Sequence, residues 1–436
     1  MKASNTNAQL FSETHEAIEW LKQFSDEDRS VAAGWLDELT VISADTLRAK
    51  LLELIKREAA QTPDMPIALY VERELAMRSQ KPQYAFHQRT MKSPRSGRPV
   101  VRAHHTVPKI RLLQPRRTLG PEAGSEAIIA NLATNLVRSD PHKYFMNPGP
   151  DKIREHGIAT IFVLTDFVGS GDRIYKFLDA FWQHPTVKSW TSLKWIRFVV
   201  LAYSATSQGA SRVKQHPSSP VIKWVAACPT IRTHYAEHEA SIIEALCQRY
   251  DPIDKDPVES LGYRGQGVML VFAHTCPNNA PRFLYKKSRK GKKWQPLFAA
   301  RSNTLTAFSP ASSAVRQHRR LAKLGAKSVG NRWALAGDQS HDVARGRLLV
   351  LASLKHGNRY REEISASTGL DLSVVEVALA DLKSFGWVGK SNALTTEGHR
   401  NLLAVGPFEL RKPDTNSLIR SSTMYYPKSL RPPVKR

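Results

Sequence analysis

The chain has 436 residues and a formal net charge of +25, from 64 lysines and arginines against 39 aspartates and glutamates. Hydrophobic residues make up 41% of it, which is enough to build sizeable cores and excludes a wholly disordered chain. Three cysteines without a CxxC pair exclude a disulfide scaffold and a thiolate zinc cluster. The polar start and the lack of an apolar run of about 18 residues predict a cytoplasmic protein without a membrane-spanning helix. The high net charge favours a polyanionic partner first and an anionic membrane surface second, and we expect no membrane partner.

The positive charge is concentrated in separate runs. Residues 1–74 carry 14 acidic against 8 basic residues, whereas 75–121 have 11 basic residues and no acid. Residues 286–332 have 13 basic residues and no acid, and the tail is basic again. Such runs attract phosphate backbones, so RNA or DNA is an expected partner, although solvated surface and linker remain an alternative. The candidate nucleic-acid-binding residues are Lys286, Lys287, Arg289, Lys290, Lys292, Lys293, Arg316, Arg319 and Arg320.

The first 75 residues have the pattern of helices. Apolar residues recur at helical spacing in AIEWLKQF and LRAKLLELIKR, and Ser25 and Ser43 are suitable N-caps. We therefore predict a helical N-terminal region over 1–75. Residues 76–121 are polar, basic and rich in proline, which predicts an extended arm or linker.

Between 122 and 300 apolar strands alternate with amphipathic helices. IATIFVLTDF, WIRFVVLAYS, PVIKWVAACP and GVMLVFAHT are the predicted strands, and helices of ordinary length separate them. This alternation predicts an α/β domain with a parallel sheet covered on both faces. Ligands of such sheets lie at the carboxyl edge of the strands, so residues 165–173 and 274–279 are the expected positions of a site.

The segment 165–173 carries the most specific pattern in the chain. Gly169, Ser170 and Gly171 stand between a strand and a helix, where backbone N–H groups and the helix dipole favour an anion. Asp166 is placed to accept hydrogen bonds from sugar hydroxyls. Neither GxGxxG nor a Walker loop fits these residues. A glycine-rich turn capped by an aspartate, without a ligand, is the alternative interpretation.

The run VLTDFVGSGDR resembles the ribose-5-phosphate loop of type I phosphoribosyltransferases. Asp166 takes the place of the second acid of that pattern, Ser170 and Gly171 that of its Thr-Gly, and Thr165 stands where a first acid is usual. The resemblance implies a site for phosphoribosyl pyrophosphate or a nucleotide, with Mg²⁺ as a cofactor. Its ligand-binding residues would be Thr165, Asp166, Gly169, Ser170, Gly171 and Asp172.

A second resemblance covers LGYRGQGVMLVFAHTCPNNAPRFLY and the WQPLF that follows. These segments look like the closing block of a phosphoribosyltransferase-like group found in bacterial conflict and anti-phage loci. The resemblance implies an effector of anti-phage defence. If the system is a retron, the partner of this effector would be a reverse transcriptase. The catalytic residues would be Asp166, His274, Asn278 and Asn279. A turn at Asn278 and Asn279 and a buried, hydrogen-bonded His274 are the alternative.

The pattern of residues 340–406 predicts two helices, a glycine that ends the second, a third helix and a two-stranded wing. WVGKSNALTTEG resembles the wing of a winged helix-turn-helix, which would follow a basic linker over 301–339 and precede a basic tail over 407–436. The presumptive recognition helix, 371–385, contains three acids and one lysine, which fits a major groove poorly. Contact with DNA, RNA or protein therefore stays open.

Two functions from different classes follow. The first is an enzyme, a glycosyltransferase of phosphoribosyltransferase type that acts at a glycosidic bond. The second is a non-catalytic nucleotide sensor that also binds nucleic acid. Thr165 favours this second function, because it replaces the first acid of the ribose-5-phosphate loop. No metal site is expected, because neither His104-His105 nor the pair His234 and His238 has a third ligand at metal-site spacing.

Overall fold

The structure is a computed structural model. It describes residues 10–75, 77–78, 81–93, 96–107, 125–253, 256–273, 275–288, 294–298, 320–321, 323–324 and 342–404. The chain divides into two units. The first contains residues 1–313 and 361–373, and the second contains 314–360 and 374–436. In the described part of the chain, no helix has both the length and the apolar character needed to cross a membrane.

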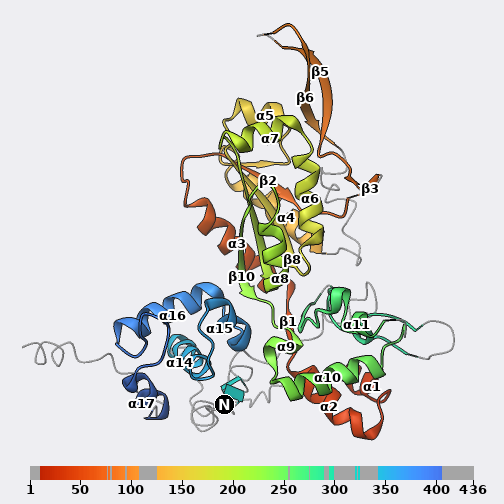
Figure 1. Ribbon diagram of the computed structural model, residues 1–436, viewed down its shortest axis with the longest axis vertical. Coiled ribbons are helices and arrows are strands. Elements are labelled where there is room, and N and C mark those ends of the chain that lie inside the picture. Colours follow the sequence, from red (N-terminus) through yellow and green to blue (C-terminus); the bar gives the residue numbers. More distant parts are fainter. Residues whose placement is uncertain are drawn as a thin grey trace, which may run out of the picture. The chain divides into compact units, whose positions relative to one another are not determined.

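A five-stranded parallel sheet forms the centre of the first unit (Figure 1). The strand order is β10-β9-β8-β2-β7, and every neighbouring pair is parallel. This confirms the predicted α/β class. The strands are β2 (Ile67–Val71), β7 (Tyr144–Met146), β8 (Thr160–Val168), β9 (Arg197–Ala205) and β10 (Val221–Ala227).

Both faces of the sheet are covered. In β8, Phe162 and Leu164 belong to one hydrophobic cluster, while Ile161 and Val163 belong to another. Helices α3 (Ala44–Ala59) and α4 (Ser125–Ser139) contribute to the first cluster. Helices α6 (Asp172–Trp182), α7 (Pro185–Ser192) and α8 (Ser207–Lys214) contribute to the second. Alternate side chains are thus buried on opposite faces, which explains why residues 161–164 of β8 form an uninterrupted apolar run.

The N-terminal residues are not purely helical, which corrects the prediction for 1–75. Helices α1 (His15–Leu21), α2 (Asp26–Asp37) and α3 are present, and Ser25 and Ser43 cap the last two. Strand β1 (Thr40–Ile42) lies between α2 and α3, and β2, which follows α3, is an inner strand of the sheet. All five residues of β2 are buried, so the segment shows no alternation that periodicity could detect.

The strand predicted in GVMLVFAHT is β11 (Leu270–Phe272), and it does not join the main sheet. It pairs in parallel with β1, and Thr40 is the register partner of Leu270. Helices α9 (Ile231–His234), α10 (Glu237–Arg249) and α11 (Pro257–Ser260) connect β10 to this second sheet. Because β1 and β11 lie over 200 residues apart, their pairing ties the two ends of the unit together.

Residues 76–121 contain a β-hairpin where an extended arm was predicted. Its strands are β5 (Phe86–Lys92) and β6 (Pro99–Thr106), preceded by the short β3 (Met77–Arg78) and β4 (Lys81–Pro82). Figure 1 shows this hairpin projecting from the sheet. Phe86 and Ala103 are buried at its base, and the remaining residues of β5 are exposed. Residues 108–124 lie outside the described residues.

The second unit contains α14 (Asp342–Lys355), most of α16 (Leu372–Ser384) and α17 (Thr396–Ala404). An antiparallel bridge between Val388 and Leu394 forms the predicted wing. Arg347 on α14 donates to the Asp381 carboxylate of α16, with its Nε 2.9 Å from Oδ2, so one acid of the presumptive recognition helix is already paired. Helix α15 (Arg361–Thr368) groups with the first unit, where Ser365 Oγ accepts a hydrogen bond from the amide of Ala227 at the end of β10.

Candidate functional site

The site lies where β2 and β8 end side by side. From β2 the chain continues to β7 on one side of the pair, and from β8 it continues to β9 on the other side. In open α/β sheets the ligand crevice forms outside the carboxyl ends of two such strands. The amide of Glu72, the first residue after β2, donates to the carbonyl of Leu164 in β8 at 2.9 Å, which fixes the two ends together.

The turn after β8 is shorter than the predicted loop. The strand continues through Thr165 and Asp166 to Val168, so only residues 169–171 form the turn before α6 begins at Asp172. Gly171 has φ +79°, a left-handed conformation that glycine adopts without strain, and it is the N-cap of α6. Thr165 is buried and Asp166 is half-buried. Both predicted residues therefore lie at the carboxyl edge, but as part of the strand.

Backbone amides of this turn point to an anion site. Within the described part of the chain, the N–H groups of Gly169, Ser170 and Gly171 have no hydrogen-bond acceptor. The eleven-residue helix α6 adds the positive end of its dipole at the same place. Ser170 Oγ accepts a hydrogen bond from the amide of Asp172 at 3.3 Å and donates to the Asp172 carboxylate at 3.2 Å. The serine hydroxyl thus orders the turn.

Asp172 forms ion pairs with two arginines at the N-terminus of α6. Its carboxylate lies 3.0 Å from Arg264 Nη2 and 3.6 Å from Arg212 Nε, and it accepts a hydrogen bond from the Tyr263 hydroxyl at 3.3 Å. The Asp172 carboxylate, which was predicted to bind the ligand, thus already contacts these three protein side chains. The two guanidinium groups are partly exposed and add positive charge beside the turn.

The two predicted segments, 165–173 and 274–279, meet at Gly169. A Cβ atom on Gly169 would overlap the side-chain amide of Asn279. Asn279 is buried, and its Nδ2 donates to the carbonyl of Tyr263 at 3.4 Å. The side chain of Asn278 is exposed, and its carbonyl accepts from the Tyr263 amide. His274 lies outside the described residues.

The far flank of the turn is packed against α8. Thr206 Oγ1 donates to the carbonyl of Gly169 at 2.6 Å and accepts from the amide of Gly209 at 2.9 Å. A Cβ atom on Gly171 would lie 2.6 Å from the carbonyl oxygen of Gly209. Helix α8 thus contacts the turn through the Gly169 carbonyl and the Gly171 Cα atom. The amides of the turn have no hydrogen-bond partner among the described residues.

Glu72 is not among the site residues that the sequence motifs predict. This carboxylate is buried, lies 3.4 Å from Thr165 Oγ1, and pairs with Arg173 through two contacts of 3.1 Å. Burial raises the pKa of Glu72 to about 7, although the Arg173 guanidinium favours the ionised form. Glu72 therefore supplies an acid beside Thr165, the position where the loop pattern lacks one. The signal was the sequence VERE directly after a buried apolar run.

Three of the predicted nucleic-acid-binding residues lie within the described part of the chain. Lys286 and Lys287 are exposed after the short helix η4 (Arg282–Leu284), and Arg320 is half-buried. The other predicted residues lie outside the described part of the chain: Arg289, Lys290, Lys292, Lys293, Arg316 and Arg319.

Comparison with known proteins matches two family profiles to this chain. The PRTase-CE profile matches residues 17–299, which include the sheet, β11 and both site segments. A second profile, wHTH-PRTase associated, matches residues 348–432. No curated protein and no solved structure matches the chain. Because the first profile covers more than half of the chain, the protein belongs to the PRTase-CE family, and the second profile shows that it carries a C-terminal winged helix-turn-helix.

Proposed function

We propose that the first unit binds a ribose 5-phosphate group, as in phosphoribosyl pyrophosphate or a nucleotide, and acts at its glycosidic carbon. The observation that carries this proposal is the juxtaposition of an anion-binding turn with two carboxylates, those of Glu72 and Asp166, where β2 and β8 diverge. The turn amides would hold the 5-phosphate, and Asp166 would accept hydrogen bonds from the ribose hydroxyls.

The site also fits the expected cofactor. Mg²⁺ in phosphate sites takes one or two carboxylates together with phosphate oxygens, and Asp166 is a half-buried carboxylate at this edge. When bound there, Mg²⁺ would neutralise charge on a pyrophosphate leaving group. Asn279, held against the turn, would keep that turn in the ligand-binding geometry.

Titration calorimetry with sugars that differ in one group tests the proposal. The purified chain with Mg²⁺ is expected to bind phosphoribosyl pyrophosphate and ribose 5-phosphate, and to bind ribose at least about tenfold more weakly, since about 1.4 kcal/mol from the phosphate contacts gives that factor. Equal binding of ribose, or no binding of either phosphorylated sugar, contradicts it. Release of pyrophosphate distinguishes an enzyme from the alternative, a sensor that binds without turnover.

We also propose the biological setting that the family resemblance implies: a cytoplasmic effector of anti-phage defence, restrained by a reverse transcriptase partner. Support comes from the PRTase-CE profile, since the motifs that resemble conflict-locus proteins lie within the matched residues. In that setting the activity would inhibit growth when released from restraint.

Nucleic acid contact is proposed for the β5–β6 hairpin. Arg89 and Arg102 are register partners on neighbouring strands, and both are exposed. Like charges directly opposite one another destabilise a hairpin, and a polyanion relieves that repulsion.

The binding constant for nucleic acid falls as salt rises, so a plot of its logarithm against log salt has a negative slope. Replacing Arg89 and Arg102 together by glutamine is expected to make that slope less negative by about 1.5, as for the loss of two phosphate contacts. Binding of a DNA or RNA oligonucleotide at several salt concentrations measures this slope. The matched control replaces Lys188 and Lys214, exposed on α7 and α8, and should leave the slope unchanged. An unchanged slope in the arginine variant would mean that the hairpin does not contact the backbone.

A further inference from the structure

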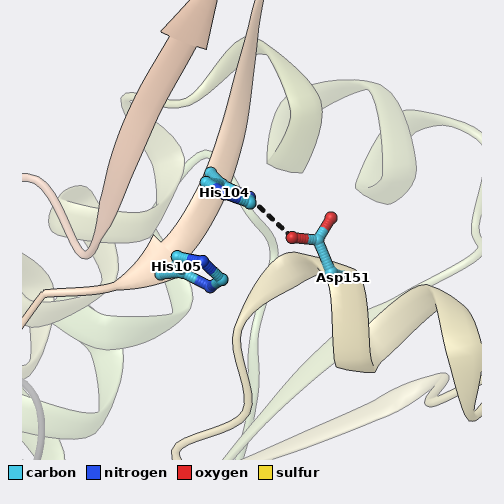
Figure 2. A group of neighbouring side chains, drawn as sticks. All are labelled: His104, His105 and Asp151. Atoms are coloured by element: carbon cyan, nitrogen blue, oxygen red, sulfur yellow. Dashed lines mark hydrogen bonds and ion pairs between the residues drawn. The ribbon is translucent and has the colours of Figure 1, made fainter.

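Three potential metal ligands meet at the base of the β5–β6 hairpin, away from the carboxyl edge of the sheet. They are His104 and His105 of β6 and Asp151 of the short helix α5 (Pro150–Glu155), and Figure 2 shows their side chains facing one another. Their ligand atoms all lie within 4.8 Å of one another. His104 Nδ1 is 2.6 Å from Asp151 Oδ2.

A β-bulge explains how two consecutive residues reach the same site. Successive side chains of a regular strand point to opposite faces. Phe86 pairs with Thr106 and Gln88 with Ala103, so His104 and His105 together oppose the single residue His87. This is the geometry of a bulge, which redirects a side chain. The two imidazole rings consequently lie side by side, with centroids 3.7 Å apart and planes at 32°.

The third ligand is fixed by a close approach of backbones. A Cβ atom on Gly149 would lie 3.3 Å from the carbonyl oxygen of His104, so glycine lets the start of α5 approach β6. Thr106 Oγ1 donates to the carbonyl of Asn147 at 3.1 Å and holds the strand to the same loop. Asp151, the second residue of α5, therefore faces the histidines in a geometry set by the backbone.

We propose that His104, His105 and Asp151 bind one zinc-class divalent cation. Two imidazoles and a carboxylate are ligands that Zn²⁺ accepts, and water completes a four-coordinate site. Bonds of about 2.0–2.1 Å in a tetrahedron separate neighbouring ligand atoms by about 3.3 Å. The contact between His104 and Asp151 thus has to open by less than about 1 Å.

Neighbouring groups support this assignment. The other oxygen of Asp151 accepts from Arg154 Nη1 at 2.8 Å, an outer contact of the kind that orients a ligating carboxylate. In the described part of the chain, the ring nitrogens of His105 have no hydrogen-bond partner, so one is available to a cation. The bound ion would join the hairpin to α5 and hold its basic strands at a fixed angle to the sheet.

Zinc titration of the full, tag-free chain tests the site. We expect one binding event with Zn²⁺, and an excess of Mg²⁺, which prefers oxygen ligands, should not compete for it. His105→Ala and Asp151→Asn should each weaken zinc binding at least tenfold, whereas His142→Ala, a change at an exposed histidine elsewhere, should not. Equal affinity in all three variants, or no binding by the unaltered chain, overturns the proposal.

Hydrogen exchange gives an independent readout. Zinc is expected to slow exchange of the amides of β6 near the bulge in the unaltered chain and not in His105→Ala. Because His105 is exposed, its replacement should leave the fold intact, which circular dichroism checks. If zinc binds and exchange in β6 is unchanged in the unaltered chain, the ion lies elsewhere. Neither measurement depends on sugar binding, so this site stands or fails separately from the proposed function.

Discussion

Asp166→Ala is expected to lower the affinity for phosphoribosyl pyrophosphate about 100-fold while the chain stays folded. A carboxylate that accepts two hydrogen bonds from ribose hydroxyls contributes about 1.5 kcal/mol for each, and a loss of about 3 kcal/mol corresponds to that factor. Asp166 is half-buried near the carboxyl end of β8, so its removal leaves no large cavity. Calorimetry at pH 6 measures the affinity, and the urea midpoint confirms the fold.

The same variant tests the effector proposal in cells. Production of the unaltered chain is expected to slow bacterial growth, and production of Asp166→Ala at the same level should not. A variant that no longer binds the sugar phosphate yet remains equally toxic would separate toxicity from this site. Loss of binding together with loss of toxicity supports both proposals.

Glu72→Gln is the companion variant, because it keeps the size of the side chain, removes its titration and leaves a neutral amide beside Arg173. With a pKa of about 7, Glu72 is protonated below pH 7 and becomes anionic above it. Affinity for an anionic ligand should therefore fall as pH rises from 6 to 8, and Glu72→Gln should show a smaller fall. Comparing the two chains with the same ligand cancels the ligand's own titration. Identical pH profiles would show that Glu72 does not face the ligand.

The stability of the chain should respond to Glu72 as well. The folded chain keeps this proton up to about pH 7, while the unfolded chain releases it near the ordinary value of 4.5. The free energy of unfolding that this group contributes is therefore present below pH 4.5 and is lost as pH rises to 7. Glu72→Gln should remove that part of the pH dependence.

Gly209→Ala is expected to lower the free energy of unfolding by about 3 kcal/mol, at the upper end for a steric insertion in a packed site. The added Cβ would lie 2.7 Å from the carbonyl oxygen of Val168 and would overlap that of Gly169, and both are backbone atoms. Helix α8 would have to move away from the turn, which breaks the hydrogen bond from Thr206 to Gly169. Urea denaturation measures the change.

Gly34→Ala is the matched control for that substitution. Gly34 lies within α2, is exposed, and has no neighbouring atom within 4 Å of an added Cβ. Alanine favours the helix over glycine, so the variant should gain about 0.5–1 kcal/mol. If Gly209→Ala is as stable as the unaltered chain, the turn and α8 are not in the close contact described.

The order of elements from β8 to β10 could be predicted because each strand is an apolar run separated from the next by an amphipathic helix. The turn at 169–171 could be predicted because glycines at the end of a strand allow the positive φ angles of a tight turn and expose its backbone amides. Glu72 could not be predicted in the same way. Its role depends on β2 lying beside β8, and that pairing joins residues more than 90 positions apart.

The bulge at His104 and His105 shows a second limit. Read as an ordinary strand, two adjacent histidines point apart, and no third ligand follows at local spacing. The register shift against β5 and the approach of α5 are both tertiary features. Ligand spacing along the chain therefore carries no signal for this cluster.

The insertion of β2 between β7 and β8 has a consequence for how the chain acquires its structure during synthesis. Strand β2 leaves the ribosome long before either neighbour. Its amides and carbonyls therefore cannot form their sheet hydrogen bonds until β7 and β8 have been translated. Pairings over such sequence distances form slowly and leave apolar segments open to aggregation. The assembled site can therefore exist only after β8 has emerged, and a nascent chain halted before residue 160 carries no ligand-binding edge.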